Sequence, residues 1–374
     1  MVEWKKLGDI AKRNKGIPIT AGQMSELNTS NGNVRVFAAG QTLADINEND
    51  LPENCAHLKP SIIVKSRGYI DFVFYEKPFT HKNEMWSYSF DDREEGKFLY
   101  YYLTTKTEFF RKKAKANSVK LPQLCVADTD DYLVPYPSLQ EQKRIVGILD
   151  TFTSSIDNLK QQIAQRRKQY EYYRDQLLDF EGKEGVEMKC ISQVAKSFTG
   201  LTYKPDNVSD TGILVLRSSN IGEDALAFDD NVYVQMNVPE RAIVRENDLL
   251  ICVRNGSKRL VGKAAMITKE AEGMAFGAFM TILRSFDINS KYLFYAWHST
   301  KVKKQYKGDE AMPIAQIIAK DFQRIIIPVP SLSEQQRIVD ILDKFEASIQ
   351  NLEAQLSQRE KQYEYYRNKL LTFE

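Results

Sequence analysis

A long helical pattern occurs twice in this chain. Residues 137–181 read PSLQEQKRIVGILDTFTSSIDNLKQQIAQRRKQYEYYRDQLLDFE, and residues 330–374 read PSLSEQQRIVDILDKFEASIQNLEAQLSQREKQYEYYRNKLLTFE. The two segments align without a gap at an offset of 193 residues, and 30 of the 45 positions are identical. The polypeptide is therefore built from two similar halves, each a globular region followed by a helix. A partner that fits one copy of the repeated surface should also fit the other.

Apolar residues in each copy are spaced alternately four and three apart. In the first copy they are Ile145, Leu149, Phe152, Ile156, Leu159, Ile163, Tyr170, Tyr173, Leu177 and Phe180. In the second copy they are Ile338, Leu342, Phe345, Ile349, Leu352, Leu356, Tyr363, Tyr366, Leu370 and Phe373. Such a heptad seam predicts a coiled coil. The S-x-x-E sequences that start at Ser138 and Ser331 predict capping boxes, and Gly182 is expected to cap the end of the first helix.

The natural partner of one such helix is the other copy in the same chain. The linker from Glu181 to Val186 leads directly into the second globular region, which fits an antiparallel pair with pseudo-twofold symmetry best. A helix of about 42 residues, rising 1.5 Å per residue, would be roughly 63 Å long. We therefore expect a stiff rod between the two globular regions. Arg166 and Arg359 interrupt the seam, and they either fix its register or extend to its edge.

Several positions outside the seam are also repeated. They are Gln169, Glu171, Tyr172 and Arg174 in the first copy, and Gln362, Glu364, Tyr365 and Arg367 in the second. Coiled-coil packing does not require this identity, so we interpret these residues as a shared surface that docks a partner. A recent duplication would leave the same identity without a function. The globular regions have diverged much further, which weighs against that alternative, although recombination could have exchanged them independently.

The two globular regions resemble each other only faintly. Residues 2–12 resemble residues 186–196, and Gly16 matches Gly200 in the same register. Short β-like runs follow at residues 34–37, 61–64 and 72–75 in the first region, and at 213–216, 249–253 and 264–267 in the second. Each region closes with a helical stretch, at residues 97–115 and 290–307. We therefore predict an α+β fold with curved sheets.

Four segments follow from this organisation. The predicted boundaries are residues 1–136 for the first globular region, 137–185 for the first helical region, 186–329 for the second globular region and 330–374 for the second helical region. The sequence contains no run of about 18 apolar residues, so we expect no membrane span. The N-terminus also lacks the apolar stretch of a signal peptide. The four cysteines show no C-x-x-C spacing, so we expect free thiols in a reducing compartment and a soluble, cytoplasmic protein.

The net charge is only +2, which is low for a protein that binds nucleic acid. Binding would therefore require basic residues gathered on particular faces. Basic runs do occur at residues 12–15, 111–115 and 301–307, although a solvated helix face is the commoner explanation of such a run.

Polar and basic residues gather in probable turns of both globular regions. In the first region they are Lys65, Ser66, Arg67, Tyr69 and Lys82, and in the second they are Arg217, Ser219, Asn220, Arg254, Asn255, Lys258 and Arg259. Arginine and lysine pair with guanine, and asparagine and glutamine with adenine, in the major groove of DNA. A solvated turn is the commoner explanation of any single loop. Two such loops at comparable places in repeated domains predict a DNA-binding surface.

Motifs for catalysis are not evident. The three histidines have no metal-ligand spacing. Residues 256–264 superficially resemble a phosphate-binding loop, but they have one residue too many between the glycines and an alanine where Ser or Thr should hold magnesium. Neither the N-P-P-Y nor the D-P-P-Y tetrapeptide of adenine methylation occurs. We therefore expect a non-catalytic protein with no metal site and no cofactor of its own.

The repeated signatures resemble those of one family, the DNA specificity subunits of type I restriction–modification enzymes. The matching segments are residues 137–146 and 171–178, their copies from residues 330 and 364, and the Arg-Ser-Ser-Asn-Ile sequence at residues 217–221. This resemblance covers the whole chain. It implies two target recognition domains that alternate with two conserved helical regions, each domain reading one half of a bipartite DNA site.

The resemblance also implies the partners of the chain. They would be double-stranded DNA, two modification subunits that bind S-adenosylmethionine and methylate adenine, and restriction subunits that translocate and cut DNA. The coiled coil would set the spacer between the half-sites. Two alternatives are a coiled-coil scaffold without DNA binding and a self-sufficient restriction–methylation enzyme. The second would require the methylase motifs that we do not find.

Overall fold

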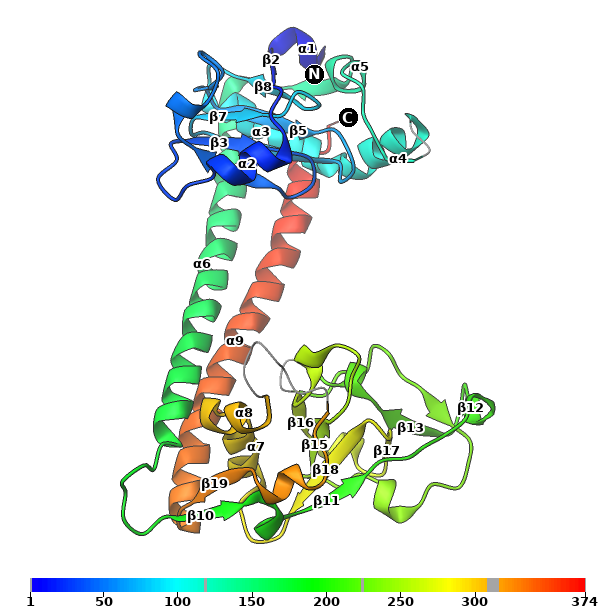
Figure 1. Ribbon diagram of the computed structural model, residues 1–374. Coiled ribbons are helices and arrows are strands. Elements are labelled where there is room, and N and C mark those ends of the chain that lie inside the picture. The colour runs from blue at the N-terminus through cyan, green and yellow to red at the C-terminus, as the bar shows by residue number, and fades with distance from the viewer. Residues whose placement is uncertain (1, 118–119, 223–224, 308–315, 374) are drawn as a thin grey trace. The chain divides into compact units, whose positions relative to one another are not determined.

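A computed structural model describes residues 2–117, 120–222, 225–307 and 316–373 (Figure 1). The chain forms two compact units. Unit 1 comprises Met1–Lys160 and Ala354–Glu374, and unit 2 comprises Gln161–Glu353. Each unit therefore contains one globular region together with part of each long helix.

The repeated segments form two long helices, α6 (Leu139–Leu177) and α9 (Leu332–Leu370), of 39 residues each. In unit 1 the ring of Phe152 stacks on that of Tyr366, and the ammonium of Lys160 lies 3.2 Å from the carboxylate of Glu360. Residue numbers therefore rise along one helix where they fall along the other. In unit 2 Tyr173 stacks on Phe345 and Arg167 pairs with Glu353, so residue numbers run in opposite directions along the two helices there as well. The predicted antiparallel coiled coil is confirmed within each unit.

Both helices begin with the same hydrogen bonds. The hydroxyl of Ser138 accepts from the backbone N–H of Glu141 at 3.4 Å, but the Glu141 carboxylate binds Arg144 at 2.7 Å. The predicted capping box is thus only half formed. Instead, the amide of Gln142 donates to the Pro137 carbonyl at 2.9 Å. The second copy repeats these contacts at Ser331, Glu334, Arg337 and Gln335.

The end of α6 differs from the prediction for Gly182. The helix stops at Leu177, five residues earlier, so Gly182 is not its cap. Gly182 has a φ of 74° and lies in a turn that the hydrogen bond from the Lys183 N–H to the Phe180 carbonyl closes. Glycine suits this turn because other residues rarely adopt a left-handed backbone.

Unit 1 contains two sheets and a two-stranded ribbon. The first sheet is antiparallel, in the order β2 (Lys12–Lys15), β8 (Trp86–Ser89), β5 (Ser61–Lys65), β6 (Asp71–Tyr75). The second is β4 (Leu43–Ile46), β3 (Val34–Phe37), β7 (Phe79–His81), with β3 and β7 parallel. The ribbon pairs β1 (Glu3–Lys6) with β9 (Leu133–Tyr136). The helices are α1 (Leu7–Ile10), α2 (Ala21–Leu27), α3 (Arg93–Thr105), α4 (Thr107–Asn117) and α5 (Ala127–Asp130).

Unit 2 repeats this topology despite its different sequence, with one additional strand, β12, at the edge of its second sheet. Its antiparallel sheet has the order β11 (Ala195–Thr199), β18 (Met280–Ser285), β15 (Leu249–Cys252), β16 (Ala264–Met266). Its second sheet is β12 (Val208–Ser209), β14 (Tyr233–Val234), β13 (Ile213–Leu216), β17 (Ala275–Phe276), with β13 and β17 parallel. The ribbon pairs β10 (Glu187–Cys190) with β19 (Ile326–Val329), and the helices are α7 (Ser290–His298) and α8 (Thr300–Lys307).

Gly16 and Gly200 lie at equivalent places in the two units, where one backbone segment passes close to another. A Cβ atom on Gly16 would lie 2.3 Å from the carbonyl oxygen of His81, and one on Gly200 would lie 2.1 Å from that of Gly277. Only glycine allows two backbone segments to approach so closely. This packing explains why Gly16 and Gly200 stand out in sequences that otherwise diverge.

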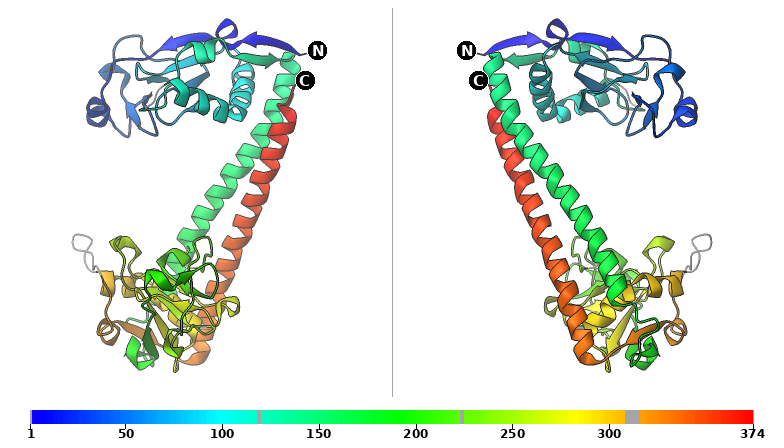
Figure 2. Two further views of the ribbon diagram at one scale, coloured as in Figure 1. Left: turned by 90° about the vertical axis from the view of Figure 1, so that its right-hand side faces the viewer. Right: turned by 90° about the vertical axis from the view of Figure 1, so that its left-hand side faces the viewer.

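Each globular region packs its core against the long helices. In unit 1, Leu149 of α6 and Leu371 after α9 join the buried cluster around Phe98. In unit 2, Leu342 of α9 joins the cluster around Trp297. Residues near both ends of the chain belong to unit 1, where Trp4 and Phe373 line one pocket; Figure 2 shows these ends close together.

The predicted strands are all present, but two helical predictions need correction. The stretch 97–115 is two helices, α3 and α4, which meet at Lys106, and the stretch 290–307 is α7 and α8, which meet at Ser299. The basic run 12–15 is a strand, β2, rather than a helix face. Within the described residues, no helix is long and apolar enough to cross a membrane.

Candidate nucleic-acid interface

The predicted loop residues of unit 1 differ in exposure. The ammonium of Lys65, at the end of β5, donates to the Gly40 carbonyl, and the hydroxyl of Ser66 donates to the Glu84 carbonyl. Both side chains are buried. Arg67 is exposed, as is Tyr69, which follows in the turn between β5 and β6.

Lys82, in the neighbouring loop, is half-buried. Its ammonium lies 3.2 Å from the carboxylate of Glu84. Because Glu84 also receives the Ser66 hydrogen bond at its carbonyl, Lys82 and Ser66 converge on one residue. In this structure Lys65, Ser66 and Lys82 therefore hold the loops, whereas Arg67 and Tyr69 face solvent.

Two predicted loops come together in unit 2. The amide of Asn255 donates to the hydroxyl of Ser218 at 2.9 Å, which joins the loop after β15 to the loop after β13. Four of the predicted residues in these loops are exposed, namely Ser219, Arg254, Lys258 and Arg259. The guanidinium of Arg254 lies over the ring of Phe279, 5.3 Å from its centroid. The sequence patterns at these two places thus form one surface.

Arg217 and Asn220 hold the loop after β13 in shape. The Asn220 side chain is fully buried, and its amide donates to the carbonyls of Ala227 and Asp230 at 3.1 and 3.2 Å. Its side-chain oxygen accepts from the backbone N–H of Arg217 at 3.0 Å. The Arg217 guanidinium pairs with the Asp230 carboxylate at 2.8 Å. In this conformation the Asn220 amide is committed internally and does not face solvent.

The predicted docking residues divide into exposed and packed groups. Glu171 and Tyr172 are exposed in the first copy, and Glu364 and Tyr365 in the second. The exposed fractions of Tyr172 and Tyr365 are 61% and 59%.

The other predicted docking residues are less exposed, and the two arginines contact tyrosines of their own helices. Arg174 is buried, and its guanidinium lies over the ring of Tyr170 at 5.6 Å from the centroid. Arg367 lies over the ring of Tyr363 at the same distance. Gln169 and Gln362 are half-buried. The exposed part of the repeated surface is thus a glutamate followed by a tyrosine in each helix.

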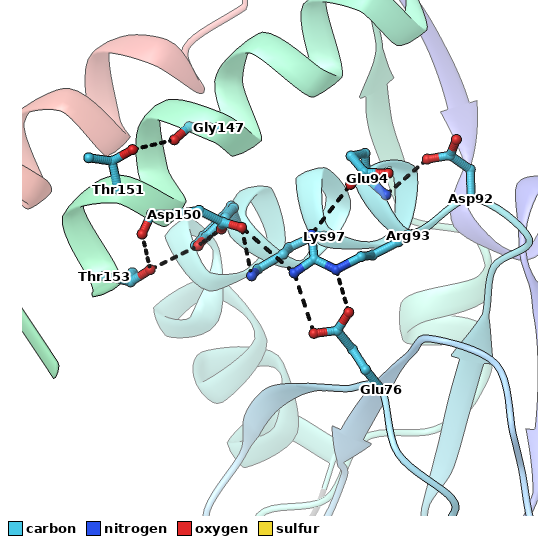
Figure 3. Close-up of polar contacts among 10 residues, drawn as sticks. Glu76, Asp92, Arg93, Glu94, Lys97, Gly147, Asp150, Thr151 and Thr153 are labelled. Carbon is cyan, nitrogen blue, oxygen red and sulfur yellow. Dashed lines mark hydrogen bonds and ion pairs between the residues drawn. The ribbon is translucent and has the colours of Figure 1, made fainter. Parts of the chain in front are cut away.

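Sequence reasoning missed the polar contact that fastens each globular region to its helix. In unit 1 the Asp150 carboxylate on α6 accepts from Lys97 of α3 at 2.9 Å (Figure 3). It also accepts from the hydroxyl of Tyr101, likewise on α3, at 2.6 Å. Burial, followed by this hydrogen bond, raises the pKa of Tyr101. Arg93, also on α3, pairs with Glu76, which raises the pKa of that arginine.

The same contact recurs in unit 2. The Asp343 carboxylate on α9 accepts from Lys291 at 2.8 Å and from the hydroxyl of Tyr295, both on α7. The lysine and tyrosine stand four residues apart in both units, on one face of their helix. That i, i+4 spacing, repeated before each long helix, is the sequence signal that could have revealed the contact.

Comparison with known proteins gives a consistent result. Residues 1–166 and 183–360 match the family described as type I restriction modification DNA specificity domain. The specificity subunit of the Escherichia coli type I restriction enzyme EcoR124I/EcoR124II is 28% identical to this chain over an alignment of 396 residues, gaps included. The alignment covers 100% of this chain and 94% of that protein.

Two solved structures have a similar fold. The crystal structure of the type I restriction–modification S subunit from M. genitalium superposes with a TM-score of 0.62 at 16% identity, covering 100% of this chain and 97% of that one. A chain from a study of complex assembly and conformational transition of the type I restriction–modification system gives a TM-score of 0.58 at 17% identity, covering 99% and 96%.

Proposed function

Because this chain belongs to the family of type I restriction–modification DNA specificity proteins, we propose that it selects the DNA sequence on which a type I restriction–modification complex acts. The observation that carries this proposal is the pair of globular units with one topology but different loop residues. A repeated frame with unlike loops suits a protein that reads two unlike sequences.

Each unit reads one half of a bipartite DNA site. Unit 1 offers Arg67 and Tyr69 at its loops, and unit 2 offers Arg254, Lys258 and Arg259. Division of recognition between two units multiplies discrimination, because each wrong base pair costs about 1–3 kcal/mol, roughly additively for separated positions. The paired helices set the spacer between the two halves.

The repeated glutamate–tyrosine faces dock two modification subunits. Glu171 and Tyr172 form one face, and Glu364 and Tyr365 form the other. Exposed tyrosines are enriched where proteins bind one another, because the ring adds apolar area and the hydroxyl a hydrogen bond. The modification subunits supply S-adenosylmethionine and adenine methylation, and restriction subunits join the complex. This chain contributes specificity and no catalytic group.

Co-expression with the modification subunit tests the proposal directly. Methylome sequencing should find adenine methylation at one two-part motif, and cells without this chain should lose it. Methylation without a fixed two-part motif would contradict the proposal. A scaffold without DNA binding predicts that the isolated protein is not retained on DNA at low salt.

A single substitution tests the division between units. Arg254→Ala should change or abolish reading of one half-site, with a loss of about 1–3 kcal/mol at the affected position. Equal effects on both halves would contradict the assignment.

A further inference from the structure

Two exposed side chains lie opposite each other in unit 1. Arg67, after β5, and Gln123, in the segment after α4, form an antiparallel backbone bridge. Hydrogen bonds on either side fix this pairing, from the Leu124 N–H to the Ser66 carbonyl at 2.8 Å and from the Gly68 N–H to the Pro122 carbonyl at 2.9 Å. Residues opposite each other in such a bridge project to the same side, with Cβ atoms about 5 Å apart.

Unit 2 contains the same arrangement with the same residue types. Arg254, after β15, forms an antiparallel bridge with Gln316. The Ile317 N–H donates to the Val253 carbonyl at 2.8 Å, which is the counterpart of the Leu124–Ser66 bond. Arg254 and Gln316 are both exposed. The two units therefore share an arginine opposite a glutamine, although their loops otherwise differ.

These side chains are not needed to hold the loops. Among the residues that the structure describes, the side chains of Arg67, Gln123 and Gln316 form no hydrogen bond or ion pair. The residues that follow the glutamines, Leu124 and Ile317, are each only 2% exposed. Buried neighbours fix the backbone, while the polar groups remain free to bind an external ligand.

We propose that Gln123 and Gln316 are specificity-determining residues, and that each unit reads two neighbouring base pairs with an arginine–glutamine pair. This inference rests on the proposed function and deepens it. A guanidinium makes two hydrogen bonds to guanine, and a glutamine amide makes two to adenine. Side chains that start about 5 Å apart reach adjacent base pairs, which stack about 3.4 Å apart.

The uncharged glutamine separates base reading from simple attraction to phosphate. Arg67 and Arg254 would each strengthen binding to any DNA, because a cation releases counterions from the backbone. A glutamine contributes nothing to counterion release. Loss of either glutamine should therefore reduce discrimination and leave the salt dependence of binding unchanged.

The variants Gln123→Ala and Gln316→Ala test this in the complete complex with its modification subunit. Methylome sequencing and competition with duplexes that carry single base replacements should show discrimination reduced about 5- to 150-fold at one position. The affected position should lie in one half-site for Gln123 and in the other for Gln316. Each variant thus serves as the control of the other. Gln235→Ala, which removes an exposed glutamine after β14, should keep the wild-type motif.

A second pair of variants tests the base preference itself. Gln123→Glu and Gln316→Glu keep the size of the side chain and remove the N–H₂ donor. The complex should therefore lose its preference for adenine at the affected position and prefer cytosine there instead. Thermal unfolding checks that every variant folds like the wild type.

The outcomes separate this inference from the proposed function. A wild-type complex with a two-part motif, combined with alanine variants of undiminished discrimination, overturns the inference alone. A uniform loss of affinity for all sequences also overturns it, because the glutamines would then only position the DNA. A wild-type complex that methylates without a two-part motif overturns both.

Discussion

The ring of Phe152 stacks on the ring of Tyr366, with centroids 5.3 Å apart and planes inclined by 26°. Phe345 and Tyr173 are the equivalent residues at the repeat offset of 193, and their rings also stack, with centroids 5.4 Å apart and planes inclined by 28°. The seam arginine Arg359 lies over the Phe152 ring at 5.8 Å from its centroid. Arg166 lies over the Phe345 ring in the same way, at 5.9 Å. The seam arginines thus bind aromatic rings of the facing helix, which favours a role in register over simple extension to the edge.

Phe152→Ala should destabilise the protein by about 2–3 kcal/mol. The substitution removes the stacked ring and its cation–π contact with Arg359. Because Phe152 is only half-buried, the loss should be smaller than the loss of about 3–5 kcal/mol for a fully buried aromatic side chain. Chemical unfolding of the isolated protein measures the change. Lys361→Ala, at an exposed position of α9, should change stability by less than about 0.5 kcal/mol. Equal effects of the two substitutions would show that the stacked ring contributes nothing.

Asp150→Ala should cost about 2–3 kcal/mol, because it leaves the hydroxyl of Tyr101 and the ammonium of Lys97 without their acceptor in a partly buried place. Asp91→Ala is a matched control, because the Lys59–Asp91 ion pair has the same chemistry at the surface, where the Asp91 side chain is 89% exposed. Surface pairs contribute little, so the control should lose much less stability than Asp150→Ala. A similar loss in both variants, measured by urea unfolding, would contradict this assignment of the helix contact.

Glu346 should make the stability of the protein depend on pH. Burial raises the pKa of this carboxyl group above its ordinary value of 4.5, and Asp343 raises it further, while Tyr295, the charge of Lys291 and the hydrogen bond from Tyr170 lower it. The folded state therefore favours the protonated form. Protonated Glu346 therefore contributes to the stability of the folded state. This contribution is complete below pH 4.5 and is lost as the pH rises through the folded-state pKa.

Glu346→Gln tests this sign. The amide keeps an acceptor for the Tyr170 hydroxyl, 3.3 Å away in the wild type, and removes the charge. The variant should be more stable than the wild type at pH 8, and the difference should shrink toward pH 4.5 in unfolding experiments. Glu364→Gln, at an exposed site, should show no such trend. A constant difference across this range would rule out Glu346 as the source.

Local patterns were enough to predict the frame of the molecule. The seam from Ile145 onward predicted the long helices and their antiparallel pairing, because a heptad repeat is a strong signal over many turns. The divisions at Lys106 and Ser299 were missed because no proline or glycine marks them in the sequence. Weaker local signals do stand there, because threonines flank Lys106 and the hydroxyl of Ser299 accepts from the backbone N–H of Val302 at 3.3 Å.

The candidate site was predicted less completely, for a different physical reason. Arg67 and Arg254 stand beside turn signals, so they could be singled out. Gln123 and Gln316 reach them only through backbone bridges between segments far apart in the chain. No local pattern encodes such a bridge. Burial is equally non-local, which is why Ser66 and Asn220 were grouped with exposed loop residues although both are fully buried.

Lengthening both helices should lengthen the DNA spacer. Four residues inserted between Lys160 and Gln161 in α6, and four between Glu353 and Ala354 in α9, add about 6 Å to each helix. That length corresponds to about two base pairs at 3.4 Å each. A coiled coil accommodates a four-residue insertion by local unwinding, so pairing should persist. Methylome sequencing of the variant complex should therefore show the same two half-sites with a longer gap.

The control for this experiment is the same insertion in α6 alone. One lengthened helix shifts the Phe152–Tyr366 contact relative to the Tyr173–Phe345 contact, so both cannot form with the original partners. The single insertion should consequently destabilise the protein and reduce methylation rather than lengthen the spacer. If the double insertion left the spacer unchanged while both half-sites were still read, the helices would not set the distance between them, and the spacing would have to come from the modification subunits.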